Sequence, residues 1–270
     1  MCSPHAGTDG VCYTGSECRR RGGEAAGSCA GGFGTCCTFA SECNTETSQN
    51  GTVFASPASL SSVCSLMIKP MHDNICQIRL DLENFMLADP DISGVCRTDY
   101  MQVTGGVANS GGIPTICGDN SGQHLIYSAI PNFPARLSVV VDNQVALSRQ
   151  WKIRITQYTC DSVERAPEGC LQYITGISGQ SHLSTVTEIT NIYTGNVSSF
   201  NWKLRDNMNG LSFSNHLSNL RYNVCVRREE GYCSIEWGVG TSFEVSNIVK
   251  VIAGKVFHSK TFRTLLATSP

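Results

Sequence analysis

The chain has 270 residues, and its 20 Lys and Arg nearly balance its 22 Asp and Glu, giving a net charge of −2. With no basic surface implied and no run of about 18 apolar residues, we expect neither a nucleic-acid partner nor a membrane span. The 15 cysteines indicate disulfides formed in an oxidising compartment, and hence a secreted, extracellular protein.

Residues 1–42 contain six cysteines and many glycines, with too few apolar residues to form a core. Such a segment must be held by bridges. Zinc is the alternative, but it needs C-x-x-C pairs or Cys/His knuckles. The adjacent Cys36 and Cys37 cannot easily share one tetrahedral ion. We therefore expect a disulfide-stapled head, whose connectivity the spacing alone leaves open.

Residues 43–160 contain runs in which apolar and polar side chains alternate, the pattern of half-buried strands. The longest run, 76–87, directs Cys76, Ile78, Leu80 and Leu82 to one face and Gln77, Arg79, Asp81 and Glu83 to the other. Shorter runs cover 52–55, 64–68, 96–103, 113–117, 125–127, 137–141 and 151–158. No segment has a sustained helical period. Many short strands at this spacing predict an all-β fold, an antiparallel β-sandwich.

Cys76 and Cys160 stand at the ends of two long alternating strands, before one and after the other. If those strands lie near each other and antiparallel, both sulfurs reach one edge of the sandwich. We predict a Cys76–Cys160 disulfide.

The landmarks of residues 43–160, taken in order, resemble a CUB domain. They are Cys43 and Cys64, ICQIRLDLENFML at 75–87, Cys96-x-x-Asp99, Ile116-Cys117-Gly118 and the strand at 151–158. The resemblance implies a CUB-type β-sandwich with Cys43–Cys64 and Cys96–Cys117 disulfides. One departure is Gln150-Trp151, where the family usually has Gly-Phe before the last strand.

The head resembles an arthropod clip domain through CSPHAGTDGVCYTGSEC and GSCAGGFGTCC, as in arthropod secreted proteins that join such a segment to a CUB domain. This resemblance implies the pairs Cys2–Cys36, Cys12–Cys29 and Cys18–Cys37. A glycine-rich stapled knot without clip ancestry is the alternative.

Many CUB domains bind calcium through acidic residues on loops at one end, and Asp91, Asp99 and Asp142 match those positions. Calcium favours several hard oxygen ligands on neighbouring loops. Against this, Asp91 is shorter than the family's Glu, and Asp142-Asn143-Gln144-Val145 replaces the usual Asp-x-Ser-Asn. The alternative is that all three are solvated loop acids.

Residues 161–270 weakly repeat the preceding domain and read as an incomplete second CUB-like domain with a divergent tail. The repeat predicts a Cys170–Cys225 disulfide and leaves Cys233 unpaired. We expect the chain to be cut short here, with a leader removed or missed before Met1. A shorter β-domain that leaves Cys233 free or bridging two chains is the alternative.

No catalytic residues are predicted. The loop Gly118-Asp119-Asn120-Ser121-Gly122 departs from the serine-protease spacing by its Asn120 and reads as a polar turn. The six histidines are scattered singly, so no zinc is expected. Sequons at Asn50 and Asn196 predict glycosylation. We expect a secreted, non-catalytic binding module for an extracellular protein or glycan, calcium being the one plausible cofactor. The alternative is the regulatory arm of an extracellular protease whose catalytic domain lies outside this chain.

Overall fold

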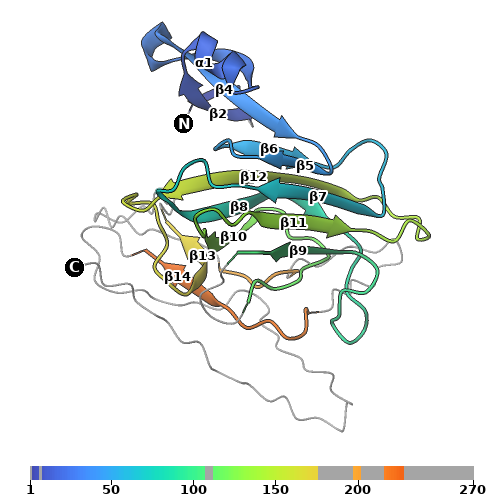
Figure 1. Ribbon diagram of the computed structural model, residues 1–270. Coiled ribbons are helices and arrows are strands. Elements are labelled where there is room, and N and C mark those ends of the chain that lie inside the picture. The colour runs from blue at the N-terminus through green and yellow to red at the C-terminus, as the bar shows by residue number, and fades with distance from the viewer. Residues whose placement is uncertain (1, 6–7, 107–111, 176–196, 202–215, 228–270) are drawn as a thin grey trace, which may run out of the picture.

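The computed structural model describes residues 2–5, 8–106, 112–175, 197–201 and 216–227, and these are nearly all β (Figure 1). Two sheets face each other around one core, which confirms the predicted all-β, CUB-type sandwich. Within the described residues, no helix is long and apolar enough to cross a membrane.

The first sheet of the sandwich places β12 at its centre, between β6 and β8, with β10 outermost. Their bounds are β6 Thr52–Ala55, β8 Ile75–Met86, β10 Gln123–Ser128 and β12 Gln150–Thr159. The second sheet has the order β5-β7-β11-β9, with bounds β5 Thr45–Thr47, β7 Val63–Ile68, β9 Tyr100–Thr104 and β11 Ala135–Val140. Apolar side chains from alternate positions of both sheets fill the space between them, among them Phe54, Leu66, Leu80, Leu137 and Ile153.

Most predicted strands are present, but two were placed wrongly. Residues 96–99 are not a strand, because Cys96 and Asp99 instead fix a loop through a disulfide and an ion pair. Residues 113–117 form only an isolated bridge between Ile116 and Met101, and Pro114 lacks the N–H that a longer ladder would need. The outer face of β8 is also less wet than predicted, because Gln77 is buried and exchanges hydrogen bonds with the backbone of Ala166.

The head contains β1 (Cys2–His5), β2 (Thr8–Tyr13), α1 (Gly15–Arg20), β3 (Glu24–Cys29), a 3-10 turn η1 (Ala30–Gly32) and β4 (Gly34–Ser41). The short helix α1 was not predicted; Thr14 caps it by accepting from the N–H of Glu17. Adjacent Cys36 and Cys37 on β4 point to opposite faces and bond to Cys2 and Cys18.

The head is joined to the sandwich by continuous backbone pairing. β4 pairs with β2 and β3 inside the head, and its last residues then pair in parallel with β6 (Figure 1). Arg154 of β12 strengthens the junction: Nη1 donates to the Asp9 carbonyl at 2.8 Å and Nε to Glu83 Oε1 at 2.6 Å. The boundary at 42/43 stays a prediction, and one sheet runs across it.

The described residues after 160 pack against the sandwich. Strands β13 (Cys170–Ile174) and β14 (Asn223–Val226) form a small parallel sheet beside β10. Leu171, Phe200 and Leu217 belong to the same core as the sandwich strands. Cys233 and Asn196 lie outside the described residues.

The described residues contain seven disulfides, and they are the seven pairs expected from the sequence. They are Cys2–Cys36, Cys12–Cys29, Cys18–Cys37, Cys43–Cys64, Cys76–Cys160, Cys96–Cys117 and Cys170–Cys225. They use 14 of the 15 cysteines and leave Cys233 over.

Candidate functional site at the loop end

Four connections meet at one end of the sandwich, which we call the loop end: residues 56–62, 87–99, 113–122 and 141–149. The antiparallel register brings them together, since β6 and β8 finish where β12 begins and β11 leads into 141–149. The predicted Asp91, Asp99 and Asp142 all lie on these loops. Loops held on a rigid scaffold are where binding residues concentrate, so this end is the candidate site.

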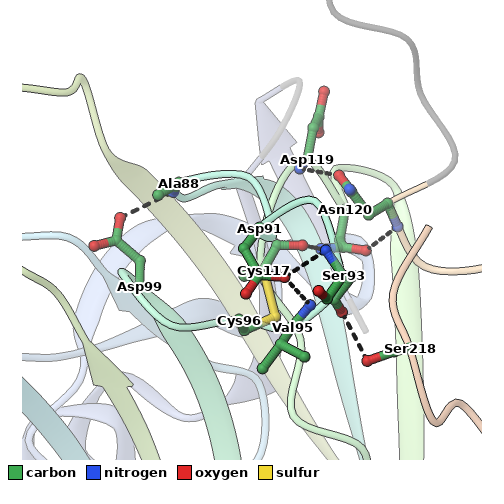
Figure 2. The surroundings of a disulfide bond; sticks show 12 residues. Ala88, Asp91, Ser93, Val95, Cys96, Asp99, Cys117, Asp119, Asn120 and Ser218 are labelled. Carbon is green, nitrogen blue, oxygen red and sulfur yellow. Dashed lines mark hydrogen bonds between the residues drawn. A yellow bond between two sulfur atoms is a disulfide. The ribbon is translucent and has the colours of Figure 1, made fainter. Parts of the chain in front are cut away.

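Asp99 is the buried centre of the loop end. Its side chain is 0% exposed and forms a two-pronged ion pair with Arg149, whose side chain is 4% exposed. Arg149 Nε donates to Oδ2 at 2.6 Å and Nη2 to Oδ1 at 3.1 Å. The N–H groups of Ala88 and Asp142 donate to the same carboxylate at 2.9 and 3.0 Å (Figure 2 draws the bond from Ala88). Both carboxylate oxygens are thus bonded to the chain itself, and Asp99 ties its own loop, 87–99, to the loop 141–149.

The side chains of Asp91 and Asp142 each bond within the loop in which they lie. Asp91 accepts from the N–H groups of Ser93 and Val95 (Figure 2). It also pairs with exposed Arg97 at 2.6 Å. The Val95 N–H, then Arg97, hold the pKa of Asp91 below its ordinary value. The carboxylate of Asp142 accepts from the N–H of Gln144 at 2.9 Å, within its own turn. Each acid therefore stabilises a local turn.

The three acids do not converge on a common point. In the part of the chain that the structure describes, no three His, Cys, Asp or Glu residues form a group that could hold a metal. The donor set also disagrees with calcium chemistry, because Asp99 already neutralises Arg149. The predicted ligands therefore do not fit calcium as they are arranged here.

Residues from the C-terminal third cover part of the loop end. Asn201 donates its N–H to Asn120 Oδ1 at 2.7 Å and accepts at Oδ1 from the N–H of Asp119 (Figure 2). A Cβ on Gly118, whose φ is +81°, would stand 2.0 Å from Asn201 Oδ1. Only glycine allows this approach at that position.

A second contact lies at Gly94, where Ser218 donates both its N–H and its hydroxyl to the Gly94 carbonyl (Figure 2). A Cβ on Gly94 would approach the His216 carbonyl to 2.3 Å. The C-terminal residues can therefore pack this closely against the sandwich loops only because Gly94 and Gly118 carry no Cβ.

The loop resembling a protease nucleophile is a structural turn. Ser121 exchanges hydrogen bonds with the backbone of Phe85, accepting at 3.0 Å and donating at 3.3 Å. Buried Asn120 donates its side-chain amide to the Cys117 carbonyl at 2.9 Å. These contacts hold the turn beside the Cys96–Cys117 disulfide (Figure 2).

Exposed apolar side chains gather on the loop end. Among the described residues, eight large apolar side chains are exposed, and Val63, Ile92, Val145 and Leu147 lie at this end. Ile92 is 88% exposed. Exposed apolar side chains on rigid loops are typical of protein-binding surfaces. The alternating pattern missed Ile92, Val145 and Leu147 because they lie in loops, and Val63 because it is the exposed first residue of β7.

His124 lies on β10 beneath β13, where its Nε2 accepts from the N–H of Tyr173 at 2.8 Å. Burial, and then the charge of Arg79, lower the pKa of His124 to about 3. Below the ordinary value of 6.5, the unfolded chain binds a proton that the folded chain rejects. Stability is therefore full above pH 6.5 and falls as the pH drops toward 3.

We expect His124→Gln to remove this acid sensitivity, because the Gln carbonyl can still accept the Tyr173 bond. Between pH 7.5 and 4.5 the free energy of unfolding should shift by about 2–3 kcal/mol in favour of the variant relative to the unmodified chain. Urea unfolding at both pH values measures this shift. Parallel pH profiles for the two proteins would contradict the assignment.

Sequence reasoning missed Arg149, which no motif marks; a cation just before the last strand was the one available signal. The sequon at Asn50 also has a structural role. Its side chain accepts from the N–H of Gln157 at 2.8 Å and donates to the Gln157 carbonyl at 3.2 Å. Glycosylation of Asn50 and Asn196 stays a prediction.

None of the curated proteins compared matches the chain. The family model described as Animal CUB domain matches residues 191–265, within the segment expected to hold a second CUB-like domain. Most of the matched residues lie outside the described part, and they include the tail from 240 that lacks cysteine landmarks. The seven disulfides and this similarity point to an extracellular protein with a protein-interaction role.

Proposed function

We propose that this chain is an extracellular, non-catalytic binding protein that engages an extracellular protein through the loop end of its sandwich. The observation that carries the proposal is a disulfide-bonded, CUB-type scaffold that gathers exposed apolar side chains on loops at one end. The similarity of residues 191–265 to the Animal CUB domain supports the same class of function.

The loop end suits a protein ligand because its loops are fixed before binding. The Cys96–Cys117 disulfide and the Asp99–Arg149 pair hold the loops that carry Ile92 and Leu147. Rigid loops lose little conformational entropy when a partner binds. The apolar side chains supply burial, and exposed Arg97 supplies a polar rim.

The test compares two charge insertions at equally exposed positions. We expect Ile92→Asp to weaken binding of a partner at least tenfold, because it places an unpaired carboxylate in the interface. Val163→Asp is the matched control, since Val163 is 86% exposed but lies in the turn after Cys160, at the opposite end. Multimerised full chain would be screened against purified secreted proteins, and its hits remeasured with both variants by surface plasmon resonance.

Loss of binding in Ile92→Asp alone supports the proposal. Equal binding by both variants would move the site away from the loop end. Hits confined to a parallel glycan array would replace the protein partner with a carbohydrate one.

The alternative function is the regulatory arm of an extracellular protease. The disulfide-stapled head favours it, because of its resemblance to clip domains. Sequencing the full-length transcript separates the two: a protease domain encoded downstream in the same reading frame would favour the regulatory arm.

A further inference from the structure

The guanidinium of Arg149 lies among five oxygen atoms of the loop end. Two are the carboxylate oxygens of Asp99 described above. The other three are backbone carbonyls of the 141–149 loop: Asp142 receives a bond from Nη2 at 2.8 Å, and Val145 and Leu147 receive bonds from Nη1 at 2.8 and 3.3 Å. The loop therefore wraps its carbonyls around a cation that belongs to the chain.

Carboxylate and carbonyl oxygens drawn from neighbouring loops are also the ligands that calcium takes. Here the same kind of oxygen set already has a positive partner. A guanidinium presents its N–H donors in a fixed plane, which matches the two-pronged contact with Asp99. For calcium to use these oxygens, Arg149 would have to leave, and a side chain that is 4% exposed would lose its counter-charge.

We propose that Arg149 is a built-in cation that takes the place of calcium, so that the loop end is fixed without a metal ion. The acids at 91, 99 and 142 then hold turns and an internal ion pair, and Asp99 offers no charge to a partner. This inference concerns how the loops are held and does not depend on whether a partner binds them.

The first experiment uses the unmodified full chain. We expect melting temperatures that agree within about 1 °C in EGTA and in about 5 mM calcium. This calcium concentration lies above the range of dissociation constants of extracellular calcium modules. Isothermal titration with calcium chloride should give only heats of dilution. A melting temperature that rises with calcium, or a saturable binding heat, would overturn the inference and leave the proposed function untouched.

The second experiment tests the ion pair itself. We expect Arg149→Gln to lower the melting temperature by about 8 °C, because it leaves Asp99 buried without its partner. Arg97→Gln is the matched control: it breaks an arginine–aspartate pair of the same length at the same end, but Arg97 is 70% exposed. That change should lower the melting temperature by less than about 1 °C.

The double variant Asp99→Asn/Arg149→Gln, measured beside Arg149→Gln and Asp99→Asn, completes a double-mutant cycle. It should be about as stable as the less stable single variant, because the second change removes a charge that the first left unpaired. Additive losses would show that the two residues do not act as a pair and would overturn the inference. If the variants fail to fold, the calcium titration of the unmodified chain still decides.

Discussion

Replacing Cys76 and Cys160 together by Ser is expected to lower the free energy of unfolding by about 4.5 kcal/mol. This disulfide spans 84 residues, the largest separation among the seven, so its removal frees the longest loop in the unfolded chain. It also joins the start of β8 to the end of β12, two neighbouring strands of the sandwich. Guanidinium unfolding of the full chain, with its other disulfides intact, measures the loss.

The matched control is Cys12→Ser/Cys29→Ser, which opens a bridge with a separation of 17 residues inside the head. The chain-entropy relation gives about 3 kcal/mol for this smaller loop. The longer loop is therefore predicted to give the larger loss in the free energy of unfolding. A larger loss at Cys12 and Cys29 than at Cys76 and Cys160 would contradict it.

Phe200→Ala is expected to lower the free energy of unfolding by about 4 kcal/mol, because Phe200 is fully buried in the sandwich core. Its ring lies 5.2 Å from that of Tyr222, so two segments that follow residue 160 meet there. The expected loss depends on these segments folding onto the sandwich. Thermal and urea unfolding of the full chain would measure it.

Phe33→Ala is the control for Phe200→Ala. It deletes the same ring from a position that is 95% exposed, at the turn between β3 and β4, and should change the free energy of unfolding by less than about 0.5 kcal/mol. Equal effects of the two changes would show that residues after 160 do not contribute to the sandwich core.

The sandwich was predictable because its strands carry a period of two. Leu80 and Leu82 are buried, while Glu83 on the opposite face is exposed. The disulfide pairings came from the resemblances to CUB and clip domains, from the strand ends next to Cys76 and Cys160, and from the weak internal repeat. The pattern misplaced 96–99 and 113–117 because it registers alternating hydrophobicity, whereas a disulfide, an ion pair and a proline decide those segments.

The candidate site was only half predictable. The resemblance to CUB domains implied that Asp91, Asp99 and Asp142 would lie on loops at one end, although the alternating pattern placed Asp99 within a strand at 96–103. It could not show that Arg149, 50 positions after Asp99, would turn into those loops. Burial of Gln77 was likewise hidden, because its cover comes from Ala166, 89 positions away. Local patterns carry no information about such distant pairs.

The uninterrupted path of β4 from the head into the sandwich sheet has a mechanical consequence. Two modules joined by a flexible linker contact a ligand independently, and the second contact depends on an effective concentration set by the linker. Here the strands of the head and those of the first sheet of the sandwich belong to one hydrogen-bonded sheet, and Phe33 lies just before β4 of that sheet. A ligand that contacts both the head and the sandwich must therefore fit the fixed distance between them.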